Sequence, residues 1–176
     1  QPFKTTKDYD NFLKRIDAFV IWMNTAENNF REGMKQNVVL PKKLVVKMIP
    51  QMRGEEIISE NLDKNIFYGP IKKLPTSFST SEKEKYTKLY QDAIKNKLIP
   101  AYKKMGDFLE KEYLPKARNT DGINALPNGK NTYTFLAKSW TTTNKSPEEI
   151  NKIGLEQVAM LRAEMEKVKT QLGFKG

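Results

Sequence analysis

The side chains that could carry chemistry in this chain are carboxylates, lysines, tyrosines, serines and threonines, because the sequence has no histidine and no cysteine. The lack of cysteine excludes disulfides, a thiol nucleophile and thiolate metal sites. The lack of histidine excludes a conventional catalytic triad, an HExxH zinc site and a proton shuttle near neutral pH. The sequence therefore predicts no complete catalytic site and no bound cofactor within this chain.

Paired carboxylates are the remaining candidates for acid and base catalysis. They occur as Glu55-Glu56, as Glu110 with Glu112, and as Glu148-Glu149. Each pair lies beside lysine or at the start of a predicted helix, which gives it a structural reason to be there. Hydrolysis of a glycoside would need two carboxylates that converge across a cleft, and sequence proximity does not indicate such convergence. We interpret these pairs as structural.

A run of hydroxyl side chains follows Trp140, with the sequence Thr141-Thr142-Thr143-Asn144. These hydroxyls could bind a peptide or another ligand. They could also form a connector that leads into the next helix, which Ser146 begins. We favour the connector, because hydroxyls in the loops before helices commonly bond to the backbone.

The composition is basic, with a net charge of +10 and 30% charged residues. Only five of the basic residues are arginines, the side chain that readers of phosphates and bases prefer. The lysines alternate with acidic residues, as in Glu82-Lys83-Glu84-Lys85. This pattern disfavours nucleic acid as a partner and is typical of solvated helical surfaces. The longest apolar run, Ala18 to Met23, is too short for a transmembrane span of about 20 residues.

The elements that would position these side chains are mainly helices. Apolar residues at spacings of three, four and seven predict a first helix over 8–32, with Gly33 as its stop. Pro41 begins a second helix, and Pro50 should break or kink it. A short helix over 51–61 follows. The apolar segment 65–79, rich in Gly and Pro, reads as an ordered loop.

One long helix kinked near Pro100, or two helices in tandem, is predicted in the middle of the chain and ends by Leu114-Pro115. Ser81 and Glu84 fit a capping box at its start.

Two further helices are predicted after a segment rich in turn residues. Asn128-Gly129 could close a hairpin with a strand over 132–135, but we favour a short helix over 130–140, because its apolar residues share one face. The last begins with Ser146 as N-cap and stops at Gly173, and its apolar positions read as a core stripe, namely Ile150, Ile153, Val158, Leu161, Met165, Val168 and Leu172. The sequence thus predicts an all-α fold, an antiparallel array of about five or six helices with one long kinked helix and ordered loops. We expect residues 1–176 to form a single helical domain.

An ordered set of short motifs resembles the bacterial domain-of-unknown-function family 885 (DUF885). The set runs through Phe108–Arg118, Gly122, Leu126–Gly129, Tyr133, Thr141–Thr143, Ser146–Ile150, Gly154-Leu155 and Val158. Upstream, Tyr9–Leu13, the Pro41 helix, Tyr68-Gly69-Pro70 and Pro100-Ala101-Tyr102 also match, so the resemblance covers nearly the whole chain.

The resemblance implies a fragment of a larger protein. Members of the family are mostly helical, many are regarded as lipoproteins of the cell envelope or periplasm, and they resemble HExxH zinc metallopeptidases. Their zinc motif lies C-terminal to the region matched here. The chain opens with Gln1-Pro2 and stops at Gly176, where such proteins continue, so we expect an internal or N-terminal portion. Zinc would belong to the full-length parent.

The resemblance also supplies candidates for a substrate cleft, which by position are Tyr133, Thr141 and Thr142. Relatives commonly carry histidine where this chain has Trp140 and Asn151. We therefore expect a non-catalytic helical portion of a zinc-dependent, peptidase-like protein. Its partners would be the remainder of the parent chain and a peptide substrate. The alternative is a lysine-rich module that binds an acidic protein, nucleic acid or an anionic surface.

Overall fold

The computed structural model describes residues 2–174, and the regular secondary structure within them is helical throughout. The predicted all-α class is confirmed, as is one long joined helix of 37 residues. The chain divides into two compact units, one up to Asp121 and one from Gly122. No helix in the described range is long and apolar enough to cross a membrane.

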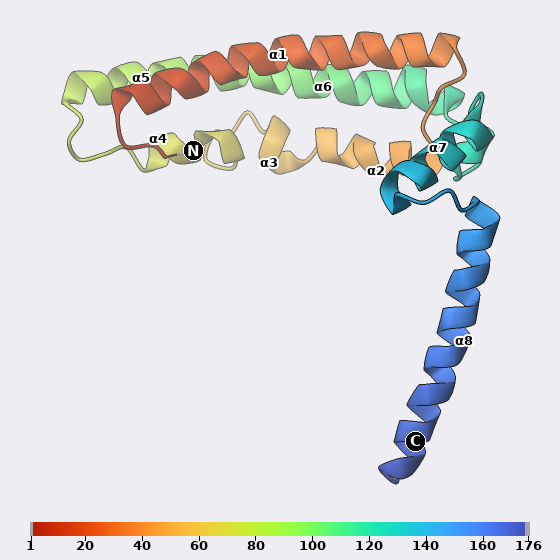
Figure 1. Ribbon diagram of the computed structural model, residues 1–176. Helices are drawn as coiled ribbons and strands as arrows, with labels where there is room; N and C mark the ends of the chain where they lie inside the picture. The colour runs from red at the N-terminus through yellow and green to blue at the C-terminus, as the bar shows by residue number, and fades with distance from the viewer. Residues whose placement is uncertain (1, 175–176) are drawn as a thin grey trace. The chain divides into compact units, whose positions relative to one another are not determined.

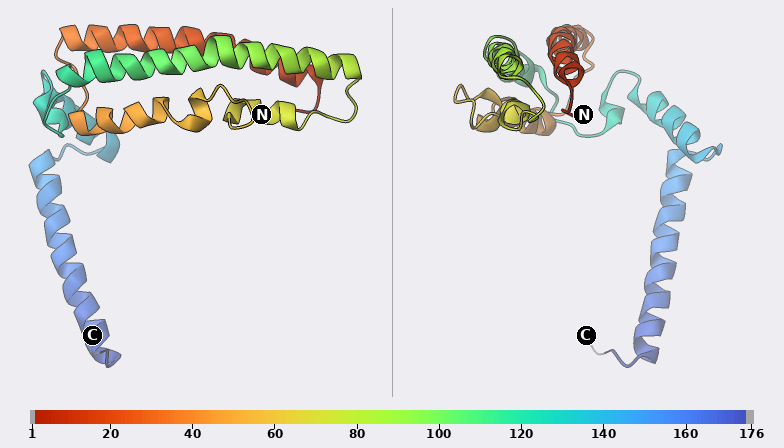
Figure 2. Two further views of the ribbon diagram at one scale, coloured as in Figure 1. Left: turned by 180° about the vertical axis from the view of Figure 1, so that it is seen from behind. Right: turned by 90° about the vertical axis from the view of Figure 1, so that its left-hand side faces the viewer.

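The first unit consists of three rows of helix that alternate in direction along the chain (Figure 1). The first row is α1 (Thr6–Lys35). The second returns through α2 (Lys42–Met52), α3 (Glu55–Ile58), the 3-10 turn η1 (Ile66–Tyr68) and α4 (Gly69–Lys72). The third, which we call the long helix, joins α5 (Thr80–Ala93), η2 (Ile94–Leu98), α6 (Ile99–Phe108), η3 (Leu109–Tyr113) and η4 (Leu114–Lys116). The rows are seen end-on in Figure 2.

Helix α1 begins at a capping box formed by Thr5 and Asp8. The predicted stop at Gly33 is wrong by two residues, since the helix runs to Lys35 and Asn37 takes the left-handed conformation (φ 57°). Gly33 instead permits a tight turn after the helix, in which the Val38 amide donates to the Gly33 carbonyl at 2.8 Å. A Cβ at Gly33 would lie 2.7 Å from the Val38 carbonyl oxygen.

The return row departs from the predictions at two points. Pro41 is the N-cap of α2, as expected, but Pro50 lies inside this helix, which ends two residues later. Pro50 has no amide hydrogen to donate to the preceding turn, and the helix ends soon after it. The segment 65–79 is ordered, as predicted, and contains the helical turns η1 and α4.

The cap of the long helix lies two residues before the predicted one. Ser79, rather than Ser81, is the N-cap, and its partner in the capping box is Glu82 rather than Glu84. The predicted helix through Pro100 is confirmed, and the ring is accommodated by the π-helical turn η2 just before it. A second π-helical turn, η3, precedes Pro115 in the same way.

Aromatic residues form the core between α1 and the N-terminal half of the long helix. Tyr9 and Tyr90 are fully buried, and Tyr86 is 1% exposed. Each hydroxyl has a partner: Tyr90 donates to the Tyr9 carbonyl at 3.2 Å, and Tyr86 donates to Asp10 Oδ1 at 3.0 Å. Farther along, Val45 of α2 packs with a second cluster, which contains Met23, Met105, Phe108, Leu109 and Tyr113.

The second unit contains η5 (Ile123–Ala125), α7 (Gly129–Thr141) and α8 (Pro147–Gln171). The predicted capping box of Ser146 and Glu149 is confirmed, and Gly173 ends the helix with φ 68°. The predicted core stripe of α8 is wrong as a statement of burial, since no residue of α8 is buried. Helical periodicity identifies an apolar side, but it does not say whether another segment covers that side.

The Gly33 contact predicts opposite effects for two substitutions of glycine by alanine. Gly33→Ala should lower the free energy of unfolding by about 1–3 kcal/mol, because its Cβ would collide with the Val38 carbonyl. Gly154→Ala in α8 meets no atom within 4 Å and should raise helicity, with a gain of up to about 1 kcal/mol. Urea denaturation followed by circular dichroism measures both. A neutral Gly33→Ala would contradict the contact.

Candidate binding site

The three residues predicted to line a cleft lie at the surface of the second unit. Tyr133 in α7 is 45% exposed, and Thr141 and Thr142 are exposed at the end of that helix. The Thr141 hydroxyl donates to the Ala137 carbonyl at 2.8 Å, and the Thr142 hydroxyl donates to the Thr141 carbonyl at 2.7 Å. These local bonds agree with a connector role for the hydroxyls. A role of the three residues in binding substrate stays a prediction.

The carboxylate pairs noted in the sequence make ion pairs within the protein. Glu110 bonds to Arg53 at 2.8 Å, and Glu55 bonds to Lys64 at 2.7 Å. Glu149 caps α8 through the backbone amide of Ser146 at 2.6 Å. One carboxylate of each pair thus has a structural partner.

A buried carboxylate that the sequence did not single out lies between α1 and α6. The Glu27 side chain is 6% exposed and accepts from Arg31 Nη1 at 2.6 Å and from Lys104 Nζ at 2.9 Å. Arg31 reaches onward to Glu112 at 2.9 Å and lies over the ring of Phe108, 4.8 Å from its centroid. The network joins α1 to both α6 and η3.

Two opposing effects act on the pKa of Glu27. Burial alone would raise the pKa, but the hydrogen bonds from Lys104 and Arg31 outweigh it, and the pKa lies below its ordinary value of 4.5. The carboxylate is therefore charged at neutral pH. Because Arg31 and Lys104 both form ion pairs with Glu27, we interpret Glu27 as a structural residue that holds α1 against α6.

A pocket within the first unit lies between α1, η1 and the long helix. Its volume is about 170 Å³, and its lining is mostly apolar: Phe12, Arg15, Ile16, Phe19, Phe67, Leu98 and Tyr102. We call it the aromatic pocket. Four of these residues lie along one side of α1, and the three apolar ones belong to the apolar pattern that predicted this helix.

The floor and walls of the aromatic pocket differ in burial. Ile16 and Leu98, which are 3% and 2% exposed, form the floor. The ring of Tyr102 packs between Phe19 and Phe67, with centroid distances of 5.5 and 5.9 Å. Trp22 stacks on Phe19 at 5.9 Å and extends the aromatic row outward, where it is 61% exposed.

The polar groups of the aromatic pocket are Arg15, which is exposed, and the Tyr102 hydroxyl. Burial raises the pKa of Tyr102, so its hydroxyl keeps its proton at neutral pH. The pocket can therefore offer an apolar space, a hydroxyl donor and a guanidinium.

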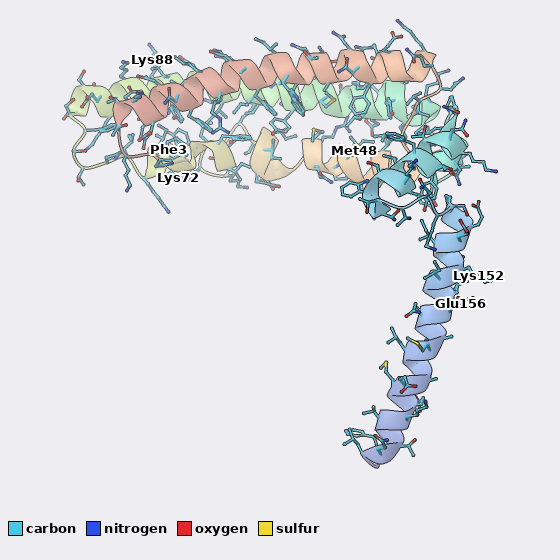
Figure 3. The ribbon with its side chains drawn as sticks, viewed as in Figure 1. Phe3, Met48, Lys72, Lys88, Lys152 and Glu156 are labelled. Atoms are coloured by element: carbon cyan, nitrogen blue, oxygen red, sulfur yellow. The ribbon has the colours of Figure 1, made fainter. Side chains whose placement is uncertain are left out.

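Helix α8 presents a second apolar surface, formed by side chains on one side of the helix. It comprises Val158, Leu161, Met165, Val168 and Leu172, which are between 47% and 69% exposed. We call it the α8 stripe. Phe174 lies beside the last four of these in a shallow hollow of about 430 Å³. Charged side chains occupy other positions, including Lys152 and Glu156, which pair at 3.9 Å (Figure 3).

A zinc site does not fit the residues of this chain. Residues 2–174 contain no cluster of three or more Asp, Glu, His or Cys side chains that could hold a metal ion. The only candidate ligands in the sequence are carboxylates, whereas zinc in proteins is held largely by His and Cys.

Comparison with known proteins identifies relatives over the whole chain. A family model described as "Bacterial protein of unknown function (DUF885)" matches residues 1–176. A solved structure described as "the putative lipoprotein from Colwellia psychrerythraea" is similar with a TM-score of 0.84 and 25% sequence identity. The similarity covers 100% of this chain and 30% of that one. No curated protein matches the chain.

The Glu27 network predicts a stability difference that depends on pH. Glu27→Gln should lower the free energy of unfolding at pH 7 by about 1–3 kcal/mol, because two charge-assisted hydrogen bonds are weakened. The matched control is Glu32→Gln on the same helix, whose exposed pair with Lys35 should contribute much less to stability because both side chains are solvated.

The sign of the pH effect follows from the lowered pKa of Glu27. Its contribution is present above the ordinary value of 4.5 and is lost as the pH falls through the lower folded value. The difference between Glu27→Gln and the wild-type chain should therefore be constant near neutral pH and shrink at acid pH. Urea denaturation at a series of pH values measures it, and an unchanged difference at pH 3 would contradict the assignment.

Proposed function

This chain belongs to the DUF885 family of bacterial proteins, and we propose that it is the non-catalytic helical portion of a longer cell-envelope protein. The observation that carries this proposal is the exposed α8 stripe. The chain spans 30% of the length of its Colwellia psychrerythraea neighbour, so a relative exists in which further chain is available to cover such a surface.

An isolated amphipathic helix has little stability when its apolar side is exposed to water. Helices are stabilised mainly when an apolar stripe packs against other elements, and hydrophobic burial contributes about 25 cal/mol per Å². The α8 stripe has the regular spacing of three and four residues that such packing uses. We assign its cover to the remainder of the parent protein.

The finer proposal is that the parent is a zinc-dependent, peptidase-like hydrolase. It rests on the family resemblance alone. Since the residues of this chain do not fit a zinc site, the metal and its ligands would be supplied by the remainder of the parent. In that protein, Tyr133, Thr141 and Thr142 are the residues of this chain proposed to face a peptide substrate.

Location in the cell envelope is supported by the description of the neighbour as a lipoprotein. The alternative function, a lysine-rich module for acidic partners, draws on the net charge of +10. Many surface lysines are already paired with carboxylates, including Lys97 with Asp17, Lys103 with Glu60 and Lys111 with Asp107. These pairs favour the first proposal.

The proposal predicts that substitutions in the α8 stripe act only in the longer protein. Leu161→Ala and Met165→Ala remove side chains that are 55% and 69% exposed here, so each should change the stability of residues 1–176 by less than about 0.5 kcal/mol. In the longer protein each should cost about 2–5 kcal/mol, because a buried side chain is truncated. Thermal and urea denaturation of both lengths provides the comparison.

Met160→Ala is the matched control for this experiment. Met160 is 49% exposed and lies on α8 outside the stripe, so its truncation should be small in both lengths. If Leu161→Ala has equally small effects in both lengths, the remainder of the parent does not cover the α8 stripe.

The zinc proposal has a separate test. Metal analysis of the full-length protein should find about one zinc per chain, and residues 1–176 alone should hold none, because the chain has no histidine or cysteine. A full-length protein free of zinc after purification without chelators would remove the peptidase proposal while leaving the helical module in place.

A further inference from the structure

We propose that the aromatic pocket binds an aromatic carboxylate, a single aromatic ring whose acidic group lies at the rim beside Arg15. The pocket lies wholly within the first unit, so this inference does not depend on the proposed function. The same chemistry could come from a small aromatic acid or from the C-terminal residue of a peptide that ends in Phe.

The size and lining of the pocket favour an aromatic ring as the buried part of the ligand. A cavity of about 170 Å³ is comparable to the apolar cavity of about 150 Å³ that accepts benzene. Phe12, Phe19, Phe67 and Tyr102 supply aromatic walls, and aromatic rings pack favourably at centroid distances of about 4.5–7 Å. The buried floor of Ile16 and Leu98 has no polar side chain for a charged group to meet.

The polar groups at the pocket select the carboxylate. Arg15 lines the pocket, and guanidinium groups form strong hydrogen bonds to carboxylates. The Tyr102 hydroxyl makes no hydrogen bond among the described residues, although the hydroxyls of Tyr9, Tyr86 and Tyr90 all do. A ligand oxygen could accept from it.

The long helix departs from regular geometry at the pocket. The π-helical turn η2 ends at Leu98 of the pocket floor, and Tyr102 follows one turn later. Turns of this kind inside α-helices occur frequently at functional sites. The π-turn also accommodates Pro100. Because it changes the rotation of the helix about its axis, it affects the direction in which Leu98 and Tyr102 face α1.

Trp22 provides a fluorescent probe for binding, because it stacks on Phe19, a wall of the pocket. The sequence has only one other tryptophan, Trp140, so Trp140→Phe leaves Trp22 as the single reporter. Titration of this variant with 3-phenylpropionate should give a saturable change with a Kd on the order of 1 mM, as expected for a ligand of this size. Methyl chemical shifts of Ile16 and Leu98 measure the same event independently.

Two substitutions test the assigned roles. Tyr102→Phe keeps the ring and removes the hydroxyl, and it should weaken binding about fivefold. Arg15→Gln should weaken binding of 3-phenylpropionate about tenfold, while leaving that of the uncharged 3-phenylpropanol unchanged. Arg162→Gln, at an exposed residue of the second unit, is the matched control and should not alter the Kd.

A tetrapeptide ending in Phe distinguishes the two sources of the ligand. Tighter binding than 3-phenylpropionate, lost when the terminus is amidated, would identify a peptide C-terminus, whereas weaker binding would identify a small acid. The proposal is overturned if neither ligand shifts the Ile16 and Leu98 methyl signals at 10 mM. It is also overturned if Arg15→Gln and Tyr102→Phe bind like the control.

Discussion

The parallel register between α1 and the long helix is the constraint on which the first unit depends. The contacts that set it join residues 76 to 81 positions apart, from Tyr86 with Asp10 at one end to Arg31 with Glu112 at the other. Buried hydroxyls and the Glu27 carboxylate lose their partners if either helix slips by one turn, and an unsatisfied buried polar group costs about 1–3 kcal/mol. The apolar surfaces alone would tolerate several registers, so the polar contacts select one.

The aromatic pocket is a consequence of that register. Its α1 stripe and its long-helix residues are continuous within each helix, but they form a pocket only where Ile16 lies against Leu98 and Tyr102 fits between Phe19 and Phe67. The polar contacts flank this region, with Tyr90 before it and Lys104 after it. A site lined by apolar side chains is thus positioned by hydrogen bonds and ion pairs outside it.

Local signals in the sequence predicted the helices well, but they did not predict which residues of other helices these helices contact. The helices, the continuity through Pro100 and the cap at Ser146 follow from periodicity and capping chemistry. The start of the long helix was misplaced because Ser79 with Glu82 and Ser81 with Glu84 have the same spacing, and only the tertiary course of the chain decides between them. The register, the π-turns and the aromatic pocket depend on contacts some 80 positions apart, which no local pattern encodes.

The net charge and the apolar surfaces of this protein suggest different kinds of partner, and the ion pairs between its helices bear on which kind is favoured. The net charge of +10 suggests an electrostatic binder, but lysines along the first unit are engaged with carboxylates of neighbouring helices, as Lys104 is with Glu27 and Lys64 with Glu55. Such pairs set register and contribute little field at a distance, because neutralised and exposed charges are screened within about 10 Å. Two apolar surfaces remain open among the described residues, namely the α8 stripe and the aromatic pocket. We therefore place the proposed contacts of this chain on its apolar surfaces, with Arg15 as the charged group beside the aromatic pocket.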